Sequence, residues 1–200
     1  MSMAVNTVPG FYITPTDEDL ITFYLKPKAM RQSLPWDGIL EKNLYEDNAM
    51  PWVILTENDW EISQKTARVY ENSVSKDEIY VFTKLKKIAG LRFVRVAGSG
   101  YWDDNQVITK IKNRQGEIVG IKKSFTFKVK GGKGQEKIDH KEKGRWIMHE
   151  YTLAGVSLVQ EVKDSDYAIC RIFRDLSKCR KNVAESSEGR QSRLDIDLNN

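Results

Sequence analysis

The chain has few of the residues that build disulfide frameworks, metal centres or membrane spans. Only two cysteines and two histidines occur among its 200 residues. A disulfide scaffold needs several paired cysteines, and neither Cys170 nor Cys179 lies in a spacing typical of a zinc site. No apolar run approaches the ~18 residues of a membrane span, and the N-terminus lacks the regions of a secretory signal. We therefore expect an intracellular protein without metal, cofactor or membrane attachment.

Motifs that carry catalysis are also sparse. His149-Glu150 is not followed by a second histidine at metal-binding spacing, so a structural histidine in a strand is the favoured interpretation. Gly98-Ser99-Gly100 lacks the rest of a dinucleotide-binding fingerprint, and Gly131-Gly132-Lys133 lacks the ending of a P-loop. Because no nucleophile and base are paired by position, we do not expect an enzyme.

Charge is distributed unevenly along a chain whose formal net charge is only +4. Residues 110–145 contain 12 basic and four acidic residues, a net charge of +8, whereas residues 1–78 carry a net charge of −6. A local excess of cations attracts a polyanion even where the net charge is small. The basic segment indicates a nucleic-acid surface, although a solvated sheet face explains it equally well from composition alone.

Helix signals precede strand signals along the chain. Thr16 can cap a helix, with Asp19 at the capping-box position, and this helix is predicted to end near Pro27. A second short helix can form at Glu41–Asp47. Segments rich in β-branched and aromatic residues then predict strands at Glu78–Thr83, Leu91–Ala97, Val107–Lys112, Glu117–Gly120, Ser124–Lys130, Trp146–Leu153 and Tyr167–Phe173. The predicted class is α+β, with helices first and an antiparallel sheet after them.

Lysines recur at even spacing inside the predicted strands. Residues two apart share one face of a strand, so the phenylalanines are expected to face inward and the lysines outward in the pairs Phe125/Phe127, Lys110/Lys112 and Lys128/Lys130. A row of cations on a rigid sheet can neutralise phosphates, with an affinity that falls as salt rises. A basic loop begins at Gly131 and runs to Arg145, and residues 176–200 have little to bury, which predicts a disordered tail.

Five sequence blocks occur in an order typical of one protein family. They are PGF with PTDEDL (residues 9–11 and 15–20), LY with PW (44–45 and 51–52), VAGSGYW with VGIKKS (96–102 and 119–124), WIMHEYTL (146–153) and YAICRIF (167–173). Over residues 7–175 the chain resembles the NAC domain of plant transcription factors. The resemblance implies a twisted antiparallel sheet flanked by helices, a nuclear location, a homodimer or heterodimer with another NAC protein, and an outer strand that binds double-stranded DNA in the major groove.

The resemblance also assigns roles to individual residues near the Gly-Ser-Gly turn. Arg95 matches the family's DNA-contacting arginine, and Lys122 and Lys123 match basic positions that contact phosphates. Asn105 and Gln106 could read a base edge, with adenine as the natural partner of an amide side chain. The full set predicted to bind DNA is Arg95, Trp102, Asn105, Gln106, Lys110, Lys112, Lys122, Lys123, Lys128 and Lys130.

Two departures from the family pattern leave a second interpretation open. Asp103 and Asp104 stand where the family is basic, and Asp103 would repel phosphate, although an acid can accept a hydrogen bond from cytosine. The dimer interface is expected at Phe11, Tyr12 and Asp19, where Tyr12 replaces an arginine that pairs with an acid of the first helix in the family. This loss would favour heterodimers. The alternative function is therefore a dimerisation protein with weakened DNA binding that modulates other NAC factors.

The predicted tail closes with the sequence LDIDLN at residues 194–199. It resembles the Leu-x-Leu-x-Leu and Asp-Leu-Asn motifs that recruit Topless-type corepressors. Leu194, Ile196 and Leu198 occupy alternate positions and could dock in a groove of such a partner. A solvated acidic end of the chain is the alternative.

Overall fold

A computed structural model describes residues 15–35, 39–68, 78–87, 93–130, 144–158, 162, 164 and 166–175. Its centre is a seven-stranded mixed sheet in the order β1-β2-β9-β8-β7-β6-β5, in which only β1 runs parallel to its neighbour. The strands are β1 (Leu40–Glu41), β2 (Glu78–Lys84), β5 (Val96–Ala97), β6 (Gly100–Lys112), β7 (Ile118–Val129), β8 (Arg145–Leu153) and β9 (Tyr167–Asp175). A separate pair is formed by β3 (Lys86–Lys87) and β4 (Phe93–Val94).

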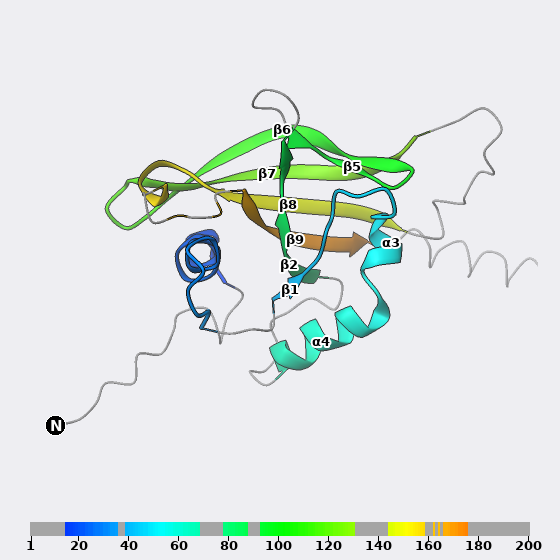
Figure 1. The fold of residues 1–200 in the computed structure, drawn as a ribbon, viewed down its shortest axis with the longest axis horizontal. Coiled ribbons are helices and arrows are strands. Elements are labelled where there is room, and N and C mark those ends of the chain that lie inside the picture. The colour runs from blue at the N-terminus through cyan, green and yellow to red at the C-terminus, as the bar shows by residue number, and fades with distance from the viewer. Residues whose placement is uncertain are drawn as a thin grey trace, which may run out of the picture.

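The helical elements are short and lie on both sides of the sheet, with the blue helical segment and α4 on opposite sides of β2 (Figure 1) and η2 against β7. They are α1 (Asp17–Asp19), the π-helical η1 (Leu20–Leu25), α2 (Lys26–Ala29), α3 (Pro51–Ile54), α4 (Glu57–Arg68) and the 3-10 turn η2 (Gly155–Ser157). No helix in the described part of the chain is long and apolar enough to cross a membrane. The predicted α+β class, with a twisted sheet flanked by helices, is confirmed.

The central strands are buried on both faces because different helices cover the two sides. On β2, Ile79 and Val81 pack in one core cluster with Trp60 of α4, whereas Tyr80 and Phe82 pack in a second cluster with η1. In Figure 1, β2 correspondingly lies between the blue helical segment and α4. A strand that is buried on both faces reads as a nearly continuous apolar run. This is why β2 and β9 are easy to recognise in the sequence.

The first helix begins as predicted but does not end where the sequence suggested. The backbone amide of Asp19 donates to Thr16 Oγ1 at 3.1 Å, and Thr16 N donates to Asp19 Oδ2 at 3.0 Å, which completes the capping box. The expected end near Pro27 is wrong, because the helical segment continues to Ala29. The wider π turn directly before Pro27 relieves the clash that a proline ring makes with the carbonyl four residues earlier.

The short helix expected at Glu41–Asp47 is absent from the structure. The backbone there bonds to β2 instead of to itself: Lys42 N donates to Phe82 O at 2.9 Å, and Leu44 N donates to Thr83 Oγ1 at 3.2 Å. These long-range bonds take the donors that a helix would need.

The longest helix, α4, was missed by the sequence reasoning. Its signal is a second capping box, in which Thr56 N donates to Asp59 Oδ2 at 2.8 Å and Asp59 N donates to Thr56 Oγ1 at 3.3 Å. Trp60, only 2% exposed, then anchors the helix in the core. The pattern Thr-x-x-Asp before a tryptophan could have revealed it.

The strand predictions succeed best where both faces are buried. Those at Glu78–Thr83, Trp146–Leu153 and Tyr167–Phe173 are confirmed as β2, β8 and β9. The two segments predicted between residues 117 and 130 form the single strand β7, and Val107–Lys112 is only the second half of β6. Residues 91–92, most of the basic loop (131–143) and the tail (176–200) lie outside the described residues.

Gly120 of β7 tests how closely the sheet packs on η1. A Cβ at this position would lie 2.5 Å from Ile21 Cδ1 and 2.7 Å from Ile21 Cγ1. We expect Gly120→Ala to lower the free energy of unfolding by about 1–3 kcal/mol through overpacking. In a urea-unfolding double-mutant cycle, Ile21→Ala should offset part of that loss, because it removes both clashing atoms. Strictly additive effects would contradict the close contact.

Candidate nucleic-acid interface

Strand β6 forms the exposed edge on one side of the sheet. Its only described outer neighbour, β5, pairs with it at Gly100 and Tyr101 alone. From Asp103 to Lys112 the outer edge of β6 therefore has no strand partner among the described residues, and Figure 1 shows it at the top of the sheet. All residues from 104 to 110 are exposed. An unpaired strand edge presents free N–H and C=O groups to whatever approaches it.

A bulge interrupts β6 in the middle of this exposed stretch. Asp104 pairs with Phe125 and Ile108 pairs with Lys123, so residues 105–107 lie opposite Ser124 alone. Gln106 has a φ of 59°, a left-handed conformation that is uncommon for a residue other than glycine. It is held there by its own backbone amide, which donates to Asp104 Oδ1 at 2.7 Å. The bulge thus bends the strand and exposes its tip.

The two amide side chains of the bulge are used differently. Asn105 bonds back to β7, because its Nδ2 donates to Ser124 Oγ at 3.1 Å and its Oδ1 accepts from Thr126 Oγ1 at 3.3 Å. Gln106 makes no side-chain hydrogen bond to a described residue. Beyond it, Val107 and Ile108 are 56% and 59% exposed, which sequence reasoning had not singled out. Of the two predicted base readers, Gln106 is thus the one with a free amide.

The predicted lysines do not form one row. Lys110 and Lys112 lie on β6 near the turn into β7, whereas Lys128 and Lys130 lie at the other end of the hairpin, on the face opposite Phe125 and Phe127. The expected inward phenylalanines and outward lysines are confirmed. The structure divides the cations into two groups instead of the single stripe that even spacing suggested.

Several of these cations already have acidic partners. Lys128 Nζ lies 2.5 Å from Asp103 Oδ2, and this hydrogen bond raises the pKa of Lys128. Lys122 Nζ lies 3.0 Å from Asp17 Oδ2 and 5.6 Å from the centre of the Tyr151 ring. The other predicted lysines, Lys110, Lys112, Lys123 and Lys130, make no ion pair with a described residue.

Arg95 is mostly buried, so little of its side chain reaches the surface where a DNA contact would need it. Its side chain is 14% exposed, and its Nη2 and Nε donate to Glu150 at 2.6 Å and 3.1 Å. The guanidinium also stacks 4.6 Å above the Phe125 ring. Burial disfavours its charge, but the hydrogen bonds to Glu150 outweigh burial and hold the pKa of Arg95 above its ordinary value. The geometry gives Arg95 a structural ion pair instead of an accessible guanidinium.

Trp102 is likewise placed inside the protein. It is 3% exposed and packs edge-to-face on Phe127, with ring centroids 5.3 Å apart. Because alternate residues of a strand face opposite ways, burial of Trp102 turns Asp103 outward. Trp102 therefore anchors β6 and has no surface with which to touch DNA.

The other predicted sites are placed only in part. Asp19, expected at the dimer interface, accepts the capping-box bonds of Thr16, whereas Phe11, Tyr12 and the motif of Leu194, Ile196 and Leu198 lie outside the described residues. His149 packs edge-to-face on Phe173 at 5.2 Å, and burial lowers its pKa. Within the described chain no group of three or more histidine, cysteine or acidic residues could hold a metal ion.

Comparison with known proteins gives one consistent answer. The model of the No apical meristem (NAM) protein family matches residues 8–153. The chain is 34% identical over 185 residues to NAC domain-containing protein 19 of Arabidopsis thaliana, covering 89% of this chain and 50% of that protein. It is 29% identical over 204 residues to NAC transcription factor NAM-1 of Hordeum vulgare, covering 88% and 44%. The chain spans about half the length of the curated relatives it matches.

The ion pair of Arg95 predicts a stability defect. Arg95→Met leaves Glu150 buried without its cation, so we expect the free energy of unfolding to fall by about 3–5 kcal/mol in urea denaturation at neutral pH. Lys110→Met, which removes an exposed lysine from β6, should change it by no more than about 0.5 kcal/mol. If the Arg95→Met variant kept wild-type stability but no longer bound DNA, the structural role would be contradicted and Arg95 would be a DNA contact.

Proposed function

We propose a DNA-binding function from one premise: this chain belongs to the NAC (NAM) domain family. In this proposal it is a sequence-specific regulator of transcription that binds double-stranded DNA with β6, as a homodimer or with another NAC protein. Relatives named as transcription factors imply a nuclear, non-enzymatic regulator. Recruitment of a Topless-type corepressor by Leu194, Ile196 and Leu198 stays a prediction from the sequence.

The observation that carries this proposal is the bulge on the exposed edge strand. The major groove of B-form DNA admits an α-helix or a two-stranded β ribbon, and β6 presents an open strand edge to it, backed by β7. The bulge at residues 105–107 makes the middle of β6 protrude, where a flat strand would hold its side chains level with the sheet.

The side chains at the tip suit base edges more than phosphates. The free amide of Gln106 can bond both N6 and N7 of adenine, and the exposed methyl groups of Val107 and Ile108 can pack on the C5 methyl of thymine. Lys110, Lys112 and Lys123 flank the tip and would contact the DNA backbone, which orients the strand without reading sequence. The proposed recognition therefore favours an A·T pair beside the bulge.

A second candidate function follows from the charges around β6. Arg95, Lys122 and Lys128, three of the predicted DNA contacts, are paired with Glu150, Asp17 and Asp103. Fewer free cations mean fewer displaced counterions and weaker binding to any DNA. In this alternative the domain serves mainly as a dimerisation partner that weakens the DNA binding of other NAC proteins.

The first test measures how many lysines near β6 contact phosphate. The full chain is titrated, by fluorescence anisotropy, onto a duplex with the CGT core that the family resemblance implies and onto a scrambled duplex. Between about 50 and about 200 mM salt, Lys110→Ala should reduce the slope of log affinity against log salt by about 0.9 for one lost phosphate contact. Lys26→Ala, a lysine of α2, should not change the slope. Absence of binding by the wild type even at low salt would reject the direct DNA-binding proposal.

The second test asks whether Asp103 restrains Lys128. Asp103→Asn removes a negative charge and the 2.5 Å ion pair, so affinity at low salt should rise and the salt slope should steepen by about 0.9 as Lys128 gains a phosphate. Glu57→Gln is the matched control, because it also deletes an exposed acid and its ion pair with Arg174, but on α4. Binding that appears only in the Asp103→Asn variant would favour the second candidate function for the natural chain.

A further inference from the structure

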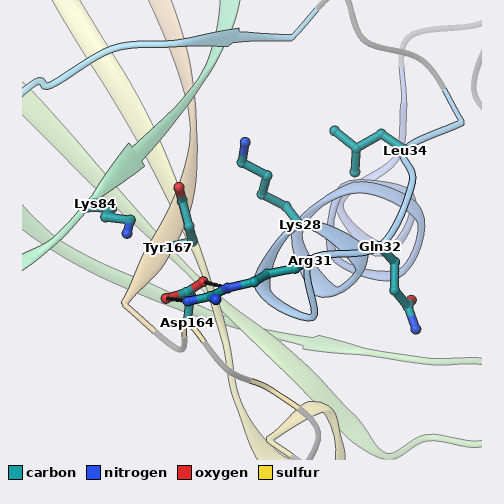
Figure 2. Close-up of a pocket in the computed structure, with 7 residues that line it drawn as sticks. All are labelled: Lys28, Arg31, Gln32, Leu34, Lys84, Asp164 and Tyr167. Carbon is teal, nitrogen blue, oxygen red and sulfur yellow. Dashed lines mark hydrogen bonds and ion pairs between the residues drawn. The ribbon is translucent and has the colours of Figure 1, made fainter.

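A second basic site lies near the edge of the sheet opposite to β6. It is a pocket of about 440 Å³ between the end of α2, the end of β2 and the start of β9 (Figure 2), lined by Lys28, Arg31, Gln32, Leu34, Lys84, Asp164 and Tyr167. Strands β9, β8 and β7 separate β2 from β6. A duplex held at the bulge of β6 would therefore leave this pocket open.

Arg31 adopts a conformation that an arginine rarely takes. Its φ is 57°, and it occupies the left-handed position that ends a helix: Arg31 N donates to Lys28 O at 3.0 Å and Gln32 N donates to Pro27 O at 2.9 Å. This position usually holds glycine, because a Cβ is unfavourable there. A strained residue that persists suggests that its side chain has a use. Here the side chain turns into the pocket.

The guanidinium of Arg31 is fixed on one side and free on the other. Its Nε and Nη2 donate to the two oxygens of Asp164 at 2.7 Å and 3.2 Å, as the dashed lines in Figure 2 mark. Asp164 is itself held to the helix, since its backbone amide donates to Ala29 O at 3.1 Å. Arg31 Nη1 bonds no described residue, and the side chain is 64% exposed. An acid that orients an arginine in this way leaves part of the donor fork for an incoming oxyanion.

Two lysines that line the pocket flank the ring of Tyr167 on opposite sides (Figure 2). Lys84 Nζ lies 4.8 Å and Lys28 Nζ 5.3 Å from the centre of the Tyr167 ring. Both carboxylate oxygens of Glu41 accept a hydrogen bond: Oε2 from Lys28 at 2.7 Å and Oε1 from the Tyr167 hydroxyl at 2.7 Å. Lys84 makes no ion pair with a described residue. Three cations thus lie beside Asp164 and Glu41, and Asp166 is near enough to help raise the pKa of the Tyr167 hydroxyl.

From this geometry we propose that the pocket binds the phosphate group of a small phosphorylated organic molecule. Arg31 Nη1 and Lys84 bond no described residue, and Lys28 keeps ammonium protons beyond the one that it donates to Glu41. The lining can therefore donate to several oxygens of a phosphate ester. Leu34 and the ring of Tyr167 provide an apolar wall for the organic part. The volume lies in the range of small-molecule pockets, about 300–1,000 Å³. The inference is independent of DNA binding at β6.

The test titrates the full chain with sodium phosphate and with phenyl phosphate, each against sodium chloride at equal ionic strength. Binding is read from backbone amide shifts in NMR spectra and from the thermal unfolding midpoint. We expect shifts at Arg31, Lys84 and Tyr167, and tighter binding of phenyl phosphate than of inorganic phosphate. Lys84→Ala should weaken phosphate binding about tenfold, the loss of one charge-assisted hydrogen bond. Lys26→Ala, a basic residue of α2 that does not line the pocket, should bind phosphate as the wild type does.

Arg31→Gly separates a binding role from a structural one. Glycine relieves the left-handed strain, so the unliganded midpoint should hold or rise while the response to phosphate is lost. If Arg31 serves only to tie Asp164 to the helix, the midpoint should fall and the phosphate response should persist, which would overturn the proposal. A phosphate response equal to that of chloride would also overturn it. Equal affinity for phenyl phosphate and inorganic phosphate would reject the organic ligand. Lys84→Ala should leave duplex binding unchanged. Success or failure of the phosphate proposal is therefore separate from DNA binding at β6.

Discussion

The buried carboxylate of Glu150 holds the frame on which β6 depends. Glu150 is 1% exposed, and a carboxylate in that position must be neutralised and hydrogen-bonded. Arg95 supplies the charge, and the Tyr45 hydroxyl donates to Glu150 Oε2 at 2.6 Å. Burial, reinforced by Glu150, raises the pKa of Tyr45 well above its ordinary value, so its hydroxyl keeps the proton that it donates. Glu150 thus joins three segments: β8, which carries Glu150, the loop after β1, which carries Tyr45, and the connection between β4 and β5, which carries Arg95.

The consequences reach the root of β6 through the backbone. Arg95 O accepts from Trp102 N at 2.9 Å, and the neighbouring turn is docked by Gly98 N, which donates to Glu46 O at 2.8 Å. Gly98 has a φ of 60°, and a Cβ there would lie 2.6 Å from Met50 Cγ. The turn that starts β6 is therefore fastened to the same loop that carries Tyr45. A defect in the buried ion pair would loosen β6 without touching its exposed tip.

Features that depend on residues close together in the sequence could be predicted, whereas features that depend on contacts between distant residues could not. The capping box of Thr16 and the strands β2 and β9, which are buried on both faces, can be predicted from residues that are close together in the sequence. The role of Arg95 is different, because its partner Glu150 is 55 positions away and no local pattern names it. A basic residue before a glycine turn looks the same in sequence whether it faces solvent or an acid. The bulge of β6 was hidden too, because it depends on how Asp104 bonds the amide of Gln106.

The two edges of the sheet show how charge is divided between stability and binding. The edge at β1 is only two residues long, and one further bond, from Lys42 N to Phe82 O, extends its pairing with β2. So short an edge strand offers few free groups to another strand. The edge at β6 is long and open, and its bulge together with Asp103 and Asp104 prevents flat pairing with another strand. Acids that protect an open edge also weaken its attraction for phosphate. In the proposed DNA-binding function, readout on this edge would therefore rest more on the shape and apolar groups of the bulge than on a general attraction to DNA.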